Sequence, residues 1–264
     1  MRHSIFRQIK PGWKRFMRGA TGLLVVLLFW ALLSRRHHPL ILPSPGETFK
    51  AMRGLWQSGS LWVNIIITLR RTLLGYSLAL LAGTILALLL KASPFWQDFF
   101  RPIITVIQII PPVVWVVFAV IWFGIAADLT PVFLIFIVTF PIIFINIFSG
   151  LDSIDSRLVE MARVYRCSRR KIITGIYFPG LVPHLVSAIS VGISFAWKST
   201  IFAEYIGSNS GVGFALSMAN SNLETEKLFA WTLILVLFML VFEYGLLQAL
   251  ERRVTGWSTD EERE

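Results

Sequence analysis

The sequence has little charge and almost no cysteine, and each shortage excludes a class of protein. Charged residues make up 15% of the 264 residues, whereas an ordinary soluble domain carries about 25%. So few charges cannot cover a water-facing surface. The hydrophobic fraction of 55% and the mean hydropathy of +0.68 exclude a disordered or collagen-like chain. A single cysteine, Cys167, excludes an internal disulfide and any site built from several cysteines.

Motifs of catalysis and nucleotide binding are missing as well. The chain has no G-x-x-x-x-G-K-[ST] sequence and therefore no phosphate-binding loop of its own. Its four histidines form no H-x-x-x-H pair, and the adjacent His37 and His38 would need further ligands to hold a metal. The glycine-rich stretch 207–213 lacks the lysine of a nucleotide site and is expected to be a flexible external loop. We expect a chain that is not an enzyme and has no cofactor or metal of its own.

Long uncharged runs dominate the sequence instead. A membrane-spanning helix needs about 20 apolar residues, and six runs come near that length. We expect an all-α membrane protein with six transmembrane helices in a domain over 19–250, a basic tail over 1–18 and an acidic tail over 251–264. The first run follows a basic start, as in a signal peptide, but no small-residue cleavage site comes after it. The six runs are 19–34, 72–90, 103–127, 129–151, 171–197 and 228–250.

The distribution of lysine and arginine predicts the orientation. With six spans, 17 of the 25 basic residues lie in the two tails and in the second and fourth loops, which share one face. Basic residues favour the cytoplasmic side, so we expect both termini and the loop 152–171 in the cytoplasm. This basic balance is a membrane property and not a sign of nucleic-acid binding. Arg35, Arg36, Arg70 and Arg71 fall on the outer side and oppose the trend.

Turn signals and prolines predict irregular features around the spans. Pro45 and Glu47 favour the start of a short external helix over 48–57, followed by a second approach to the membrane over 61–71. Pro111, Pro112 and Pro141 interrupt apolar runs. They predict either packing kinks or hinges for gating.

The cytoplasmic loop carries the most informative pattern. Leu158, Met161, Val164 and Tyr165 recur at helical spacing, and the hydroxyl of Ser168 can cap a second short helix. An apolar stripe on a basic cytoplasmic helix indicates a protein partner. The alternatives are packing on the chain's own bundle or on anionic lipid headgroups.

Residues in this loop match a known motif at the right spacing. Glu160, Met161 and Ala162, followed by Ile176, Phe178 and Pro179, resemble the "EAA" coupling loop of bacterial binding-protein-dependent ABC importer permeases. Met161, Phe178 and Arg166 depart from the usual Ala, Leu and Gly. The Gly allows a turn between two short helices, so Arg166 must either use ordinary backbone angles or adopt left-handed ones at a cost.

The resemblance continues along the chain, from about residue 41 to residue 252. Each further match is short, but their order and spacing together are specific to the nitrate/sulfonate/taurine-type group of these permeases. The matching segments are 42–47, 68–71 with 75–76, 102–112, 123–125, 196–198, 203–207 and 228–232.

The resemblance implies the type I ABC importer permease architecture and its partners. It implies a homodimer of permease copies, two cytoplasmic ATPase subunits that bind the ATP, an external solute-binding protein, and a location in the lipid of the bacterial inner membrane. The solute is expected to be small and anionic: a sulfonate, taurine, nitrate or a thiamine-precursor-like molecule. The residues expected to contact the ATPase are Glu160, Met161, Ala162, Val164, Tyr165, Arg166 and Pro179.

Ionisable residues within the apolar runs supply the candidates for the pathway. Lys198 lies near the expected end of the fifth span, close to Glu204, and Glu243 lies in the sixth. Such residues are costly in a membrane and indicate functional sites. Either Lys198 pairs with one of these carboxylates or snorkels outward, or it faces the pathway and attracts an anion. Lys198 and Glu204, with Pro111 and Pro112 as breaks, are the pathway candidates.

Two other function classes are weighed against the permease. A secondary transporter or channel without ATPase partners would show inverted repeats and several midplane charges. A membrane-embedded enzyme would show a polar cluster of His, Asp or Ser near one face. The sequence shows neither pattern.

Overall fold

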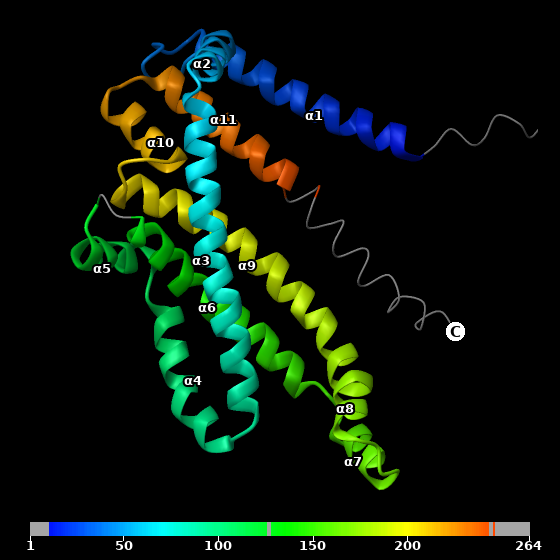
Figure 1. Cartoon of the computed structure of the whole chain (residues 1–264). Coiled ribbons are helices and arrows are strands. Elements are labelled where there is room, and N and C mark those ends of the chain that lie inside the picture. Colours follow the sequence, from blue (N-terminus) through cyan, green and yellow to red (C-terminus); the bar gives the residue numbers. More distant parts are fainter. Residues whose placement is uncertain (1–10, 126–127, 243–244, 246–264) are drawn as a thin grey trace, which may run out of the picture.

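The computed structural model describes residues 11–125, 128–242 and 245, with side chains from residue 21 onward (Figure 1). Throughout this part of the chain every regular element is a helix. The helices are α1 (Pro11–Ser34), α2 (Pro45–Gln57), α3 (Ser60–Lys91), α4 (Pro94–Ile109), α5 (Pro112–Phe123), α6 (Leu129–Asp152), α7 (Ser156–Val164), α8 (Arg169–Ile172), a π-helical turn (Ile173–Tyr177), α9 (Phe178–Gly207), α10 (Val212–Ser221) and α11 (Thr225–Phe242).

Helix α6 is the centre of the bundle and packs against both α3 and α9. Glycines make the approach of α3 close. A Cβ at Gly75 would lie 2.7 Å from the Cβ of Ile135, and one at Gly83 would lie 3.0 Å from a methyl group of Ile143. The apolar core between the three helices includes Tyr76, Ile147 and Trp197, so these helices form the frame that positions the other elements.

Four helical segments are long and apolar enough to cross a membrane: 60–91, 129–152, 169–207 and 225–242. A fifth span results if α4 and α5 count together, and the apolar part of α1, 21–34, is shorter than a full span. The all-α membrane architecture is therefore confirmed, while the expected number of six spans holds only approximately. The boundaries expected for the terminal tails lie partly outside the described residues and stay predictions.

The breaks expected within the apolar runs have different outcomes. The break at Pro111 and Pro112 within the run 103–127 is confirmed, because the chain bends there by 95° between α4 and α5. The break at Pro141 is wrong, since Pro141 lies within a continuous α6. The expected separate approach over 61–71 is also wrong, since Arg70 and Arg71 lie within the unbroken α3, which is 32 residues long.

The second half of the chain contains more helix than expected. The fifth span does not end near Trp197, because α9 continues to Gly207. A short helix, α10, follows where only loop was expected. The sixth span is described as far as Phe242 in α11, so Glu243 and the rest of that run lie outside the described residues.

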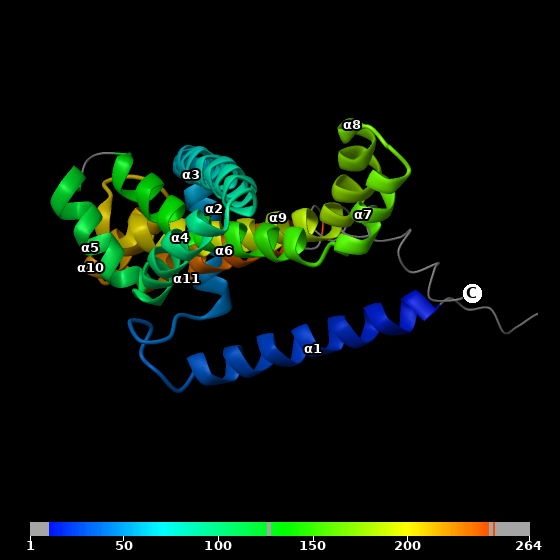
Figure 2. The ribbon, with the colours of Figure 1, turned by 90° about the horizontal axis from the view of Figure 1, so that it is seen from below.

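The two ends of the bundle carry different elements (Figure 1). α2 and α10 lie at one end, the α2 end, and α7 and α8 at the other, the α7 end. The expected helix over 48–57 is confirmed as α2, which starts with Ser44 and Glu47 bonded to each other's backbone. Figure 2 shows α1 running apart from the other helices. Near its end, Trp30 stacks on Phe229 and donates a hydrogen bond to the carbonyl of Pro43.

Candidate functional site

The segment between α6 and α9 folds into two short helices at the α7 end. α7 begins at Asp155, whose carboxylate accepts a hydrogen bond from the amide of Arg157 over 2.8 Å. α8 begins at Ser168, whose hydroxyl accepts from the amide of Lys171 over 3.4 Å, so the expected serine cap is confirmed. The π-helical turn then leads from α8 into α9 without a break.

The apolar stripe of α7 faces solvent. Val164 and Tyr165 are 80% and 77% exposed, and Leu158 and Met161 are about half exposed. These four apolar side chains lie together on one short exposed segment. The stripe is therefore a surface without a partner in the single chain, and packing on the chain's own bundle does not cover it.

The opposite face of α7 holds the two short helices together. Val159 and Ala162 are buried and pack against Ile172 of α8. Ala162, expected among the contact residues, therefore has a packing role. Glu160 is exposed, whereas Pro179 is half-buried in the first turn of α9.

Arg166 takes the left-handed backbone conformation. Its φ of +52° lies where residues other than Gly are strained. Its amide donates to the carbonyl of Arg163 and the amide of Cys167 donates to that of Ala162, which is the Schellman pattern that ends a helix. The turn expected for the family's Gly is thus present, and the arginine adopts it at a cost.

Replacing Arg166 with Gly is expected to stabilise this turn by about 0.5–1 kcal/mol, because the strain of a left-handed L-residue slightly exceeds the extra chain entropy of Gly. Hydrogen exchange of the amides of Arg166 and Cys167 should slow accordingly. The matched control is Arg163→Gly within α7, which should loosen the helix by about 1 kcal/mol. If both variants speed exchange, the strain argument is wrong.

A charged cluster joins α3, α6 and α9 nearer the α2 end. The Arg71 side chain is 1% exposed and that of Glu204 is fully buried, with Nη1 of Arg71 3.0 Å from Oε1 of Glu204. Nε and Nη2 of Arg71 donate to Oδ1 of Asp128 over 2.8 and 2.6 Å. Asp128 also pairs with Arg70. Two arginines thus face two carboxylates and the formal charges cancel, which matters most for the buried pair of Arg71 and Glu204, since Arg70 and Asp128 are about half exposed.

The same cluster fixes the segment between α9 and α10. Arg71 donates to the carbonyl and the hydroxyl of Ser210 over 2.7 and 2.9 Å. The amide of Gly211 donates to Oδ1 of Asn64 over 3.0 Å. Gly211 has a φ of +99°, and a Cβ there would lie 2.3 Å from the carboxyl of Glu204. The stretch 207–213 is therefore held against α3, in contrast to the flexible loop expected.

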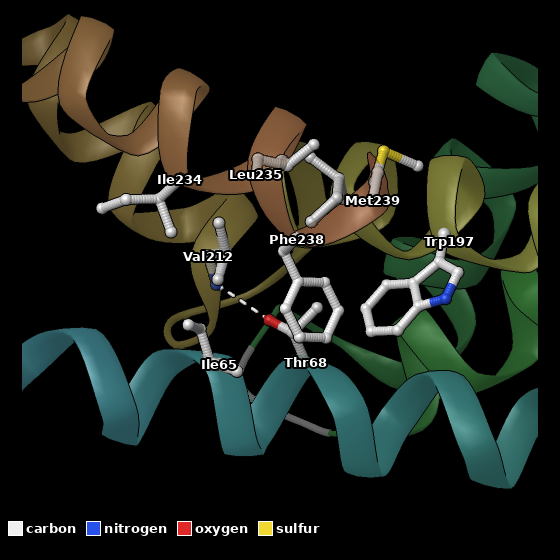
Figure 3. Close-up of a pocket in the computed structure, with 9 residues that line it drawn as sticks. Ile65, Thr68, Trp197, Val212, Ile234, Leu235, Phe238 and Met239 are labelled. Atoms are coloured by element: carbon white, nitrogen blue, oxygen red, sulfur yellow. Dashed lines mark hydrogen bonds between the residues drawn. The ribbon is translucent and has the colours of Figure 1, made fainter. Parts of the chain in front are cut away.

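The second oxygen of Glu204 completes this anchoring. Oε2 accepts hydrogen bonds from the hydroxyl of Thr68 over 2.8 Å and from the amide of Gly213 over 3.1 Å. The Thr68 hydroxyl accepts in turn from the amide of Val212 over 2.9 Å, the dashed line in Figure 3. Glu204 is thus a structural link between α3 and the start of α10, and the geometry does not turn it toward a solute.

Lys198 is separate from this cluster. The expected alternative in which it pairs with Glu204 is wrong, because Arg71 takes that carboxylate. Lys198 is exposed, with its ammonium 5.7 Å from the centroid of the Phe195 ring, and α9 continues beyond it for roughly 13 Å at 1.5 Å per residue. Within the described residues no carboxylate pairs with Lys198. Pro111 and Pro112 lie on another element, at the bend between α4 and α5.

One small enclosed cavity lies next to these groups. The cavity in Figure 3, between α3, α9, α10 and α11, has a volume of about 20 Å³, room for about one water. Its lining includes Ile65, Trp197, Val212 and Phe238 and is apolar. Over the described part of the chain, no three His, Cys, Asp or Glu side chains lie close enough together to hold a metal ion.

Sequence reasoning missed Arg71, Asp128, Asn64 and Ser210. From the sequence, Arg71 is an outer-face charge and part of the matching segment 68–71, but not a member of a site. A signal was present, since two adjacent arginines interrupt an otherwise apolar stretch, and such residues in a span need partners.

Comparison with known proteins gives a consistent result. Residues 79–256 match the family described as "Binding-protein-dependent transport system inner membrane component". The chain is 26% identical to the taurine transport system permease protein TauC of Escherichia coli (strain K12), covering 95% of this chain and 94% of that protein. It is 26% identical to the putative aliphatic sulfonates transport permease protein SsuC of Bacillus subtilis (strain 168), covering 94% and 91%. It is 28% identical to the nitrate import permease protein NrtB of a Synechocystis strain, covering 82% of each.

Solved structures share the fold. A chain of the MetNI methionine ABC transporter in an inward-facing conformation gives a TM-score of 0.59 at 18% identity and covers 73% of this chain and 94% of its own. A chain of an amino acid ABC transporter with histidines gives 0.59 at 22% identity and covers 72% and 92%. These likenesses support the helical arrangement described above.

Proposed function

The chain belongs to the family of binding-protein-dependent transport system inner membrane components, the permeases of ABC importers, and we propose that it passes a small oxyanion across the membrane. The chain is thus a transport subunit and not an enzyme, and the class without ATPase partners is set aside. The solute class we propose is an organic sulfonate such as taurine, or an oxyanion of similar size such as nitrate. The observation that carries this proposal is Lys198, an exposed cation on α9 that no carboxylate among the described residues pairs with, a set that leaves out Glu243.

The relatives support the solute class. The printed names of three of them refer to taurine, aliphatic sulfonates and nitrate, and each of these solutes carries a sulfonate or nitrate group with several oxygen acceptors. Desolvating such an anion costs several kcal/mol unless a fixed positive charge replaces its water. A lysine on a helix face within the membrane supplies that charge.

The partners follow from the exposed surfaces. We propose that the α7 stripe of Leu158, Met161, Val164 and Tyr165 docks on a cytoplasmic ATPase subunit, with Glu160 and Arg166 at its edge. A chain without a phosphate-binding loop must obtain ATP hydrolysis from such a partner. Two identical permease chains related by a twofold axis, the commonest symmetry of assemblies, would present two stripes to two ATPase subunits. An external binding protein would deliver the solute at the α2 end.

Replacing Lys198 with Met is expected to lower uptake of taurine or another small sulfonate by roughly tenfold or more, because the anion loses a compensating charge worth at least about 1.4 kcal/mol. The assay uses the permease assembled with its ATPase and binding protein in proteoliposomes. Lys198→Arg keeps the charge and is the matched control, expected to retain most uptake. Normal uptake by Lys198→Met would make Lys198 an outward anchor and remove the argument for an anion.

The proposed orientation places both termini and the α7 end in the cytoplasm. Cys167 is exposed and is the chain's single cysteine, so the native chain reports its own topology. In intact cells a membrane-impermeant thiol reagent should leave Cys167 unlabelled, whereas a permeant reagent should label it. The double variant Cys167→Ser, Asn222→Cys, with the new thiol at the end of α10, should show the opposite result. Labelling of native Cys167 by the impermeant reagent would reverse the orientation.

A further inference from the structure

One outward face of α9 differs in chemistry from the other outward faces of the bundle. Ser187, Val191, Ser194 and Lys198 recur at steps of four, three and four residues and so lie along one line of the helix. We call this line the α9 seam. Ser187, Val191 and Lys198 are exposed, and Ser194 is half-buried with its hydroxyl donating to the carbonyl of Ser190 over 3.0 Å. Three of the four positions thus have polar side chains.

The faces of α3 and α5 provide the comparison. The exposed residues in the second half of α3 are aliphatic apart from Ser77, and the exposed side chains of α5 are all apolar. Such faces suit lipid, in which a polar group costs free energy and a charged one costs more. The α9 seam combines two hydroxyls with an ammonium and therefore does not have the composition of a lipid-facing surface. The exposed aliphatic residues in the stretch 73–91 of α3 are Leu73, Leu74, Leu78, Leu81, Ile85, Leu88 and Leu89.

A polar pair extends the seam onto α6. Oδ1 of Asn146 accepts a hydrogen bond from the hydroxyl of Ser187 over 3.4 Å, and Nδ2 of Asn146 donates to the carbonyl of Ile142 over 2.8 Å. An amide nitrogen has two N–H groups, so one donor remains for a ligand. The pair thus presents one free N–H group of Asn146 where α6 meets α9, while Ser187 donates its single O–H to Oδ1 and orients the amide.

We propose that the α9 seam lines the water-filled pathway and that Asn146 and Ser187 form a second, uncharged station for the oxyanion. The station lies about 16 Å from Lys198 toward the α7 end, at 1.5 Å per residue. A passage must bind its solute well enough to admit it and weakly enough to release it. Lys198 attracts the anion, and the neutral N–H of Asn146 further along holds it without a full charge, which favours release. This inference rests on the proposed function for its solute.

Accessibility to water tests the seam without any transport assay. Single cysteines replace Ser187, Ser194 or, as the control, Leu81 in a Cys167→Ser background, in the permease assembled with its ATPase and binding protein in membrane vesicles. A small charged methanethiosulfonate should label the two seam positions at least about tenfold faster than position 81, because only the thiolate in water reacts rapidly. Slow labelling at all three positions would overturn the inference. So would efficient copper-catalysed crosslinking of Ser194→Cys between two copies, which would make the seam a dimer contact.

Uptake tests the station. Asn146→Leu, which removes the amide at similar volume, should lower taurine uptake by roughly fivefold to tenfold, as expected for the loss of hydrogen bonds to a charged group. Asn146→Gln, which keeps the amide N–H donor, should retain more taurine uptake than Asn146→Leu. Unchanged uptake by Asn146→Leu would overturn the proposal that Asn146 and Ser187 form a station for the oxyanion. Failure of the proposed function looks different: the native complex would then transport no sulfonate or nitrate at all, whatever the labelling of the seam.

Discussion

Replacing Arg71 with Met is expected to destabilise the folded permease by about 3–5 kcal/mol, because it leaves the fully buried Glu204 without its cation. The variant also removes the hydrogen bonds that Arg71 donates to Ser210, so the segment between α9 and α10 loses its attachment to α3. The measurements are the amount of folded protein in the membrane and the thermal unfolding of the detergent-purified chain. Little folded protein is expected at all.

The adjacent residue provides a matched control. Arg70 is on the same helix and pairs with the same Asp128, but its side chain is 58% exposed. An exposed pair contributes about 0–1 kcal/mol, so Arg70→Met should be nearly neutral. Equal losses of stability from Arg71→Met and Arg70→Met would contradict the argument that the burial of Arg71 makes its substitution costly.

A double variant separates charge from packing. Glu204→Gln alone leaves Arg71 buried beside a neutral amide, although Asp128 still pairs with it. In Arg71→Met, Glu204→Gln no carboxylate remains buried without a cation, so part of the stability should return. If the stability loss of the double variant equals the sum of the losses of the two single variants, packing of the side chains, and not charge pairing, accounts for the stability of the cluster.

The charged cluster also explains why sequence reasoning weighed the wrong partner for Glu204. Arg71 and Glu204 are 133 positions apart, and no spacing rule connects residues at such a distance. Lys198 is only six residues from Glu204, so a local search pairs those two first. The bundle instead brings α3 beside α9 and gives the carboxylate to Arg71. With its charge balanced, Arg71 no longer interrupts a helix, and the expected approach over 61–71 merges into α3.

Features set by a few neighbouring residues could be predicted from the sequence. The serine cap of α8, the start of α2 and the exposed stripe of α7 each follow from a few neighbouring residues, and the structure confirms them. Pro111 correctly indicated a break, but no local pattern predicts the 95° bend or the packing of α5 against α6 and α9. The family and the partners came from the resemblance, since periodicity alone gave only spans and an exposed stripe.

The backbone conformation of Arg166 separates what the sequence can predict from what only the structure shows. The motif fixed that a turn belongs there, and elementary sterics limited the arginine to two outcomes. Only the structure decided between them, through the Schellman bonds that end α7. The turn lies directly after Tyr165, at the end of the α7 stripe, whose four apolar side chains are exposed.

Replacing Val164 with Asp is expected to abolish stable association with the ATPase while leaving the permease folded. Val164 is 80% exposed, so a carboxylate there stays hydrated in the free chain and costs the fold little. In the assembled importer the same carboxylate would be buried in an apolar contact without a partner, which costs several kcal/mol.

A loss of that size reduces the affinity by a factor of roughly 100 or more, enough to prevent co-purification. Val164→Thr, similar in shape and uncharged, is the matched control and should bind the ATPase nearly as well as the native chain. Thermal unfolding of the isolated permease should be the same for both variants, which separates a docking defect from a folding defect. The docking proposal is wrong if Val164→Asp still co-purifies with the ATPase and supports solute-coupled hydrolysis at the native rate, because the stripe would then have no partner in the assembled importer.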